Sequence, residues 1–427
     1  MTSPGSAVPR AHRAALLAFA TNGALVGSLL PRYPEIARAL DLSTAGLGLT
    51  VVAFAVGAAA AGRLPEVPLR RFGSRRVVAV GTWGIALALW LAALAAGLGP
   101  AAAWGFAALL AVAGFGDAVV DVAQNAQGLR VQRALGRSAL GRMHAGWSAG
   151  AAGAGLLGTV AASAGVPLGV HLAATGVAFG TLATAAARDF LAEGEATGPS
   201  GTRSPSPTAG PASDPAGASS ARPAPLEIVP ASPTNAVALA ALATVALGGL
   251  AVEVIGADWA AWFLSTVHGV PAERAGVGVA AVLGAQFAGR LVGDRVIDRL
   301  GGRGASRTGL CAVVAGLLLA AWSPSTGPAL AGLALAGAGS AVTVPVAFAG
   351  ADALPGLPPG RGLAVIGWAM RAVTLGVSPT VGLAGEAFGL SVALSIVAVV
   401  AGVAAVATAA TPGAPATGVP ASTDRSG

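Results

Sequence analysis

The sequence predicts an all-α membrane protein with twelve transmembrane helices in two pseudo-symmetric six-helix bundles. Three observations support this prediction. Two of them concern composition: 55% of the 427 residues are hydrophobic and only 10% are charged, whereas a soluble domain carries about 25% charged residues. The third is the length of the apolar runs, because a helix of about 20 apolar residues crosses a bilayer core of about 30 Å. The same composition excludes a soluble globular enzyme, a disordered protein and a coiled coil.

Apolar runs bounded by Arg, Pro or Gly clusters define the predicted helices. A helix satisfies its own backbone in lipid, and the runs lack the alternation of membrane-barrel strands. The runs of the first half span 14–31, 44–62, 76–98, 101–127, 143–164 and 166–187. The runs of the second half span 236–257, 274–291, 305–322, 328–350, 362–382 and 388–410. We therefore expect an N-terminal bundle over 1–187 and a C-terminal bundle over 236–411.

The segment between the two bundles has a different composition. Residues 188–235 contain nine of the 28 prolines, and Ser, Gly and Ala fill most of the rest. Such a segment buries too little apolar surface to order itself. We therefore expect a flexible cytoplasmic linker there and a disordered tail over 412–427, which has a similar composition.

The positions of the arginines predict the orientation. All 25 basic residues are arginine. With both termini in the cytoplasm, 21 arginines fall in cytoplasmic segments, Arg32, Arg38 and Arg274 fall outside, and Arg371 lies within a run. This bias indicates a multi-pass protein of the cell (inner) membrane, so the net charge of +7 does not indicate nucleic-acid binding. Without lysine the chain cannot form a G-x-x-x-x-G-K-[ST] loop, which excludes an ATP-driven pump on this chain.

The two halves repeat short motifs at offsets of 227 to 230 residues. The matched pairs are AGLGL at 45–49 with AGVGV at 275–279, Gly62-Arg63 with Gly289-Arg290, and RFGSRR at 71–76 with DRLGGR at 298–303. Many secondary transporters built from such repeats place a binding site near the middle of the membrane.

The loop after the second run of each half resembles the G-x-x-x-D-R-x-G-x-R-R motif of the major facilitator superfamily. The second half matches it at Gly293, Asp298, Arg299, Gly301 and Arg303; the first half has Arg71, Gly73, Arg75 and Arg76, with Arg70 in place of the aspartate. Other segments resemble the MosC-like branch, which is similar to the fucose-permease type: RYPEI at 32–36, DVAQNAQG at 121–128, HAGWS at 144–148, Glu253 with Asp258-Trp259, and Ser378-Pro379. The resemblance implies gating roles for Arg71, Gly73, Arg75, Asp298, Arg299, Gly301 and Arg303.

Three acidic residues lie within the predicted helices. Charges in a span are costly and are therefore functional candidates. A carboxylate in a low-dielectric site can gain and lose a proton near neutral pH, so we expect Asp117, Asp121 and Glu253 to carry proton coupling. The alternative for the two aspartates is a structural gate, in which one of them pairs with Arg71 or Arg75.

Polar and aromatic side chains in the runs are candidates for binding the substrate. They are Asn22, Arg32, Gln124, Asn125, His144, Trp147, Asp258, Trp259, Gln286 and Arg371. Asn125 shares a helix face with the two aspartates, and His144 shares one with Trp147.

Most of these candidates have an alternative role. Helix–helix hydrogen bonding is favoured for Asn22 and Gln286. The alternative for Asp258 and Arg32 is an ion pair between them across the outer mouth. The alternative for His144 is a structural pairing, for Trp147 packing in the core, and for Arg371 neutralisation of one of the acids. Trp104 and Trp322 are expected in the interfacial aromatic belt.

These residues predict a secondary active transporter, which is not an enzyme, moving a small polar solute such as a sugar or polyol by alternating access and proton-coupled symport. The energy source is a proton gradient, with no cofactor. No metal site is expected, because Cys311 is the single cysteine and the histidines lack ligand spacing. The expected partners are one small-molecule substrate and the lipid bilayer, with no nucleic acid, and the chain is expected to be a monomer.

Three alternatives are weighed against symport. A proton-driven drug or metabolite efflux antiporter is disfavoured because Gly146-x-x-x-Gly150-x-x-Gly153 contains no proline of the kind found in drug exporters of this superfamily. A membrane-embedded enzyme would require an HExxH motif or paired catalytic groups, and neither appears in the sequence. A receptor or scaffold would not require acids in the fourth and seventh helices.

Overall fold

The computed structural model describes residues 7–62, 64–136, 139–192, 233–355, 357 and 361–411, and all of their regular elements are helical. The first half contains α1 (Ala7–Leu29), η2 (Leu30–Arg32), α2 (Tyr33–Ala39), α3 (Thr44–Ala61), α4 (Glu66–Ala96), η3 (Pro100–Ala102), α5 (Ala103–Leu135), α6 (Leu140–Ser163) and α7 (Leu168–Ala187). The second half contains α8 (Pro233–Val254), the π-helix η4 (Ile255–Trp259), α9 (Ala260–Val267), α10 (Ala272–Ala275), α11 (Val277–Trp322), α12 (Thr326–Ser340), α13 (Thr343–Asp352), α14 (Arg361–Phe388), α15 (Leu390–Ala407) and η5 (Thr408–Ala410).

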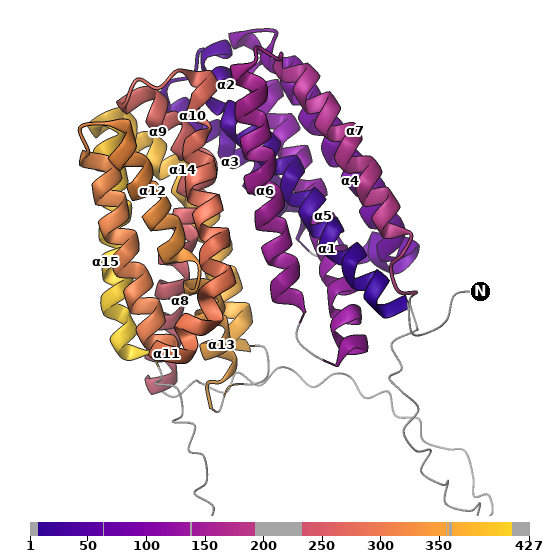
Figure 1. The fold of residues 1–427 in the computed structure, drawn as a ribbon, viewed down its shortest axis with the longest axis vertical. Coiled ribbons are helices and arrows are strands. Elements are labelled where there is room, and N and C mark those ends of the chain that lie inside the picture. Colours follow the sequence, from indigo (N-terminus) through magenta and orange to yellow (C-terminus); the bar gives the residue numbers. More distant parts are fainter. Residues whose placement is uncertain are drawn as a thin grey trace, which may run out of the picture.

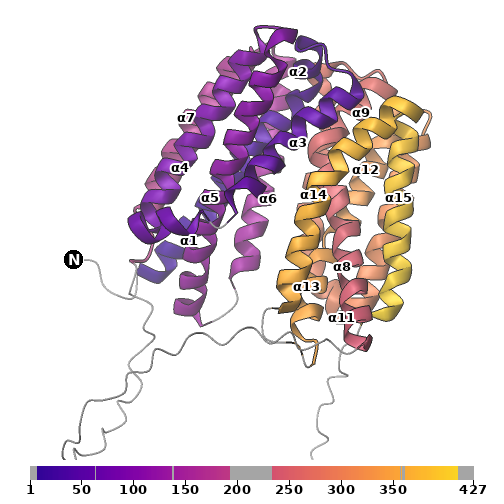
Figure 2. The same ribbon diagram turned by 180° about the vertical axis from the view of Figure 1, so that it is seen from behind.

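The helices form two bundles that lean together at one end (Figure 1). The bundles meet at the end that carries α2, α9 and α10, which we call the distal end. They diverge toward the end where α7 finishes and α8 begins, which we call the linker end (Figure 2). Most of the predicted linker, residues 193–232, and the predicted tail, 412–427, lie outside the described residues.

Ten helical stretches of the described chain are long and apolar enough to cross a membrane. One of them, Ala272–Trp322, contains two of the predicted spans. The glycine-rich α6 is not among the ten, because glycine replaces larger apolar side chains along much of its length. With α11 counted as two passes and α6 included, the helices correspond to the twelve predicted segments. The predicted all-α membrane fold is confirmed.

The internal repeat reappears as a matched pair of backbone turns. Gly73 interrupts α4 with φ 75° and ψ 159°, and Gly301 interrupts α11 with φ 68° and ψ 164°. The two positions are 228 residues apart. Each turn requires a positive φ, which glycine adopts without steric penalty, so the glycine of each loop motif has a backbone role.

The arginine two residues after each turn is also matched. Arg75 Nη2 donates to the carbonyl of Phe190, just after α7, at 3.1 Å. Arg303 Nη2 donates to the carbonyl of Thr411, just after α15. Each half therefore ties its own last helix to its own central loop, and we call these two contacts the loop clasps.

Replacing Gly301 by alanine is expected to lower the free energy of unfolding by roughly 1–3 kcal/mol, the cost of holding an L-residue at positive φ with an extended ψ. A Cβ at this position meets no atom within 4 Å, so the effect isolates the backbone angle. Gly284→Ala in the same helix is the control, because its Cβ also meets nothing within 4 Å and its backbone is helical. Thermal unfolding in detergent measures both variants, and equal melting temperatures would contradict the assignment.

Candidate functional site

The first half contributes a wall of acidic and amide side chains from α5 and α1. Asn22 Nδ2 donates to Asp117 Oδ1 at 2.9 Å, and Asn125 Nδ2 donates to Asp121 Oδ1 at 2.8 Å. The two aspartates are close enough for their charges to act on each other, as their spacing on one helix face predicts. Asp121 is exposed and Asp117 is half-buried, so the more accessible carboxylate is the one bonded to Asn125.

The second half contributes a polar network centred on Glu253 of α8. Arg290 Nη2 donates to Glu253 Oε2 at 3.1 Å. Gln286 Nε2 lies 3.1 Å from the same oxygen and 3.2 Å from Ser340 Oγ. Arg290 Nη1 also donates to Ser148 Oγ of α6, in the other half. One guanidinium therefore contacts both halves of the molecule.

Arg290 lies at the end of the predicted run 274–291 and is one of the 21 arginines counted as cytoplasmic, whereas the structure places it within a continuous helix. In the structure α11 continues beyond Arg290 to the turn at Gly301. Arg290 lies 13 residues after Val277, the first residue of α11, which is a rise of about 20 Å. Since the bilayer core is about 30 Å thick, this spacing was the signal that could have placed Arg290 inside the membrane.

Two further residues lie near the carboxylate of Asp121. His144 and Arg371 lie near enough to Asp121 for their charges to act on its carboxylate. The ring of His144 packs edge-to-face against Phe19, with centroids 5.1 Å apart. The guanidinium of Arg371 lies 5.5 Å from the ring centroid of Trp368.

We call this group the central charged cluster and define it by six residues: Asp117, Asp121, His144, Glu253, Arg290 and Arg371. Its charged and titratable side chains come from α5, α6, α8, α11 and α14. Because the hydrogen bond from Arg290 to Ser148 crosses between the halves, any relative movement of the halves at this depth must alter the cluster.

Several predicted substrate-binding residues make helix–helix contacts in the structure. Gln124 is buried and donates to the carbonyl of Ala18 in α1 at 2.8 Å. Trp147 is half-buried and packs directly against Gly23 of α1. The bonds of Asn22 and Gln286 likewise join helices of the same half, as the favoured alternative described.

The alternative in which Asp258 pairs with Arg32 is wrong. Arg32 is 2% exposed; its Nε donates to Glu35 Oε2 at 2.6 Å, and its Nη2 donates to the carbonyl of Val166 at 2.9 Å. Asp258 accepts a hydrogen bond from Ser378 of its own half. Arg32 is thus paired within the distal end of the first half, with an acid one helical turn away, while its buried Nη1 has no hydrogen-bond partner in the described part of the chain.

The family model of the Major Facilitator Superfamily matches residues 15–355. The chain belongs to the major facilitator superfamily. It is 28% identical over 388 residues to an uncharacterized MFS-type transporter of Yersinia pestis, covering 90% of this chain and 91% of that one. It is 32% identical over 141 residues to the membrane protein MosC of Rhizobium meliloti, covering 33% and 35% of the two chains. The structure of a D-xylose-proton symporter superposes with a TM-score of 0.68 at 14% identity, covering 96% and 98%.

The superfamily loop motif does not provide the gate pairing that was the alternative for Asp117 and Asp121 of α5. Arg75 forms the first loop clasp with Phe190, and the guanidinium of Arg71 lies 5.2 Å from the ring centroid of Phe72. Asp117 and Asp121 bond to asparagines instead. In the second half Arg303 forms the other clasp, and Asp298 and Arg299 are exposed.

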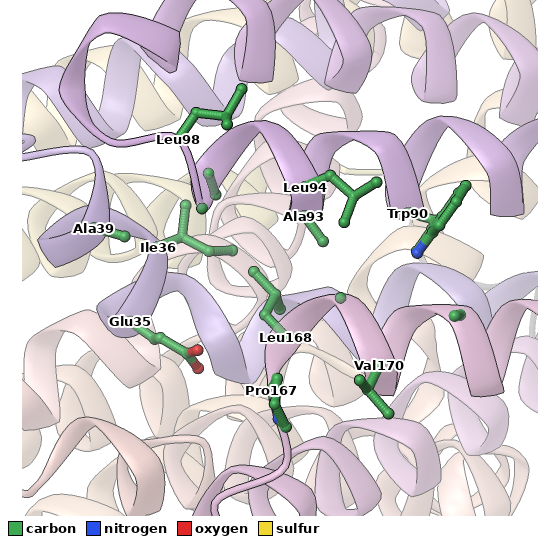
Figure 3. A pocket seen from close by; sticks show the side chains of 14 residues that line it. Glu35, Ile36, Ala39, Trp90, Ala93, Leu94, Leu98, Pro167, Leu168 and Val170 are labelled. Atoms are coloured by element: carbon green, nitrogen blue, oxygen red, sulfur yellow. The ribbon is translucent and has the colours of Figure 1, made fainter.

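A groove of about 580 Å³ lies away from this superfamily transporter's central charged cluster, at the distal end between α2, α4 and α7 (Figure 3). Its walls are apolar, including Trp90, Leu94, Leu168 and Val170, and Glu35 is its carboxylate. Since Glu35 is already paired with Arg32, the groove offers few groups for a polar solute. Within the described residues, no group of three or more His, Cys, Asp or Glu side chains could hold a metal ion.

Proposed function

We propose that this protein is a proton-coupled symporter that moves a small polar solute, such as a sugar or polyol, by alternating access. The observation that carries the proposal is the position of Arg290 between Glu253 of its own half and Ser148 of the other. A proton on Glu253 removes the charge that holds the guanidinium, and this weakens a contact between the halves. Proton binding is thereby linked to movement of one bundle against the other.

The proposed orientation places the linker end in the cytoplasm. The positive-inside rule supports this placement, because most of the arginines lie in segments that join helices at that end (Figure 1). With the distal end outside, the bundles meet at the outer surface and diverge toward the cytoplasm (Figures 1 and 2), which supports an inward-facing state. We propose that the protein acts as a monomer in the cell membrane and that a proton gradient drives transport.

The chemistry of the cluster supports a hydroxyl-rich solute. The Asp121 carboxylate accepts hydrogen bonds from hydroxyl groups, and the Asn125 side-chain amide can donate and accept them. Trp368 is 69% exposed beside Arg371, and the ring face opposite the guanidinium is available for a sugar ring. The fold similarity to a D-xylose-proton symporter favours the same solute class.

Uptake in proteoliposomes under an imposed pH gradient tests the proposal. A panel of labelled pentoses, hexoses and polyols serves as the probe, and a dye inside the vesicles reports proton movement. Glu253→Gln and Asp117→Asn are expected to abolish accumulation against a gradient, because neither side chain can then carry a proton. Asp294→Asn, an exposed acid of α11, is the control. If both test variants kept proton-coupled flux at the parent level, the coupling assignment would be wrong.

A further inference from the structure

The seventh predicted helix contains a π-helical turn, η4, between α8 and α9. Such turns are rare and occur frequently at functional sites. Asp258 and Trp259 are adjacent in this turn, and both reach the same hydroxyl. Ser378 of α14 donates to Asp258 Oδ2, and Trp259 Nε1 lies 3.4 Å from Ser378 Oγ. The indole of Trp259 is completely buried.

The same residues lie where the two halves touch. Helix α3 of the first half packs against α14 near the distal end (Figure 2). A Cβ on Gly48 of α3 would lie 2.6 Å from the carbonyl oxygen of Ser378, 3.1 Å from the Cα of Gly382 and 3.2 Å from Cζ2 of Trp259. Real Cβ atoms essentially never come within 3.0 Å of another heavy atom in this way, so only glycine fits here while the halves are in contact.

Further contacts across the halves surround this point. Trp262 Nε1 donates to Thr44 Oγ1 at 3.3 Å, and the backbone N–H of Ala45 donates to Glu386 Oε2 at 3.2 Å. The buried Tyr33 of the first half lies close enough to Asp258 for the charge of the carboxylate to act on its hydroxyl group. The π-helical turn therefore packs against the first half through the indole of Trp259, next to the hydrogen bond from Trp262 of α9 to Thr44.

We propose that Asp258, Trp259, Ser378 and Gly48 form a lock that holds the distal end closed, and that Asp258 and Trp259 position this gate and do not bind solute. The inference rests on the proposed alternating access. In the closed state Ser378 ties the π-helical turn to α14, and the indole fills the space that Gly48 leaves open. Opening the distal end withdraws Gly48 and uncovers the indole.

Spin-label distances in the full-length protein test the lock. With Cys311 replaced by serine, one label pair on Leu98 and Phe388 reports the distal end, and a second pair on Val67 and Leu300 reports the linker end; all four side chains are at least half exposed. Gly48→Ala is expected to lengthen the distal-pair distance and shorten the linker-pair distance, with a change of about tenfold in the ratio of the two states.

Gly46→Ala is the matched control, because its Cβ would meet nothing nearer than 3.6 Å and lies one helical half-turn away. It is expected to keep the parent distances. Ser378→Ala provides a second variant that adds no volume; it removes both hydrogen bonds of the lock and is expected to shift the distances in the same direction by a smaller amount. Parent distances in both Gly48→Ala and Ser378→Ala would overturn the lock.

The distances also separate this inference from the proposed function. If the lock variants shift the distances while the parent shows no proton-coupled uptake, the lock stands and the symport proposal fails. If coupled uptake is observed and neither lock variant shifts the distances, the symport proposal stands and the lock fails.

Discussion

Arg290→Ala is expected to abolish proton-driven accumulation and to slow solute exchange by at least about tenfold, which corresponds to roughly 1.4 kcal/mol at the transition between states. The substitution leaves Glu253 with Gln286 as its hydrogen-bonding partner and removes the bond to Ser148 of the other half. Removing one partner of a fully buried ion pair costs about 3–5 kcal/mol. Here both side chains are about a quarter exposed, so we expect a loss of roughly 2 kcal/mol in the free energy of unfolding.

Matched variants separate the role of Arg290 from a general effect of charge. Arg295→Ala removes an exposed arginine from the same helix and is expected to leave uptake and melting temperature unchanged. Arg290→Lys keeps the charge but replaces a forked donor by a single ammonium, so it should retain part of the exchange. The double variant Arg290→Ala with Glu253→Gln should regain stability, because no lone carboxylate remains, without regaining coupling. Parent-level accumulation in Arg290→Ala would contradict the assignment.

Gly114→Ala is expected to lower the free energy of unfolding by about 3 kcal/mol or to prevent folding, which is the upper range for overpacking a core. Helices α3 and α5 cross with glycine on each side. A Cβ on Gly114 would lie 1.9 Å from the carbonyl oxygen of Phe54, and a Cβ on Gly57 would lie 1.8 Å from that of Ala111. These overlaps are with backbone atoms, which cannot move aside as the end of a flexible side chain does.

Gly105→Ala controls for the loss of a glycine in the same helix. A Cβ at this position meets no atom within 4 Å, and alanine favours the helix by up to about 1 kcal/mol over glycine. Size-exclusion profiles after heating in detergent measure both variants. The crossing has no special role if Gly114→Ala and Gly105→Ala lose monodisperse protein at the same temperature.

The sequence was sufficient to predict where most helices lie, because spanning length and apolar composition depend on the bilayer and not on tertiary contacts. The spacing in the sequence also predicted that Asp117, Asp121 and Asn125 share one face of a helix, since this follows from helical periodicity alone. Arg290 was counted as cytoplasmic because an arginine at the end of an apolar run ordinarily marks the membrane edge, whereas here the helix continues and a carboxylate of another helix pairs with the guanidinium.

The remaining errors concern the choice between partners. Arg32 had Glu35 within one turn and Asp258 in another helix, and no pattern in the chain separates a local pair from a pair across the mouth. The π-helical turn at Ile255–Trp259 leaves no trace in hydropathy, because its register depends on packing around Trp259. The contact of Gly48 with Ser378 joins residues 330 positions apart, which periodicity within one helix cannot reveal.

The loop clasps have a consequence for how a chain of this kind can arise. Arg75 reaches Phe190 and Arg303 reaches Thr411, so each clasp closes entirely inside its own half. Gene duplication copies both residues of such an internal contact together, so the contact can form in each half without further change. A contact between the halves has one side in each copy, so duplication alone does not preserve it. Gly48 and Arg290 keep their residue types at the matched positions Gly278 and Arg63, so the specificity of these contacts depends on the other side, on Trp259 and on Ser148.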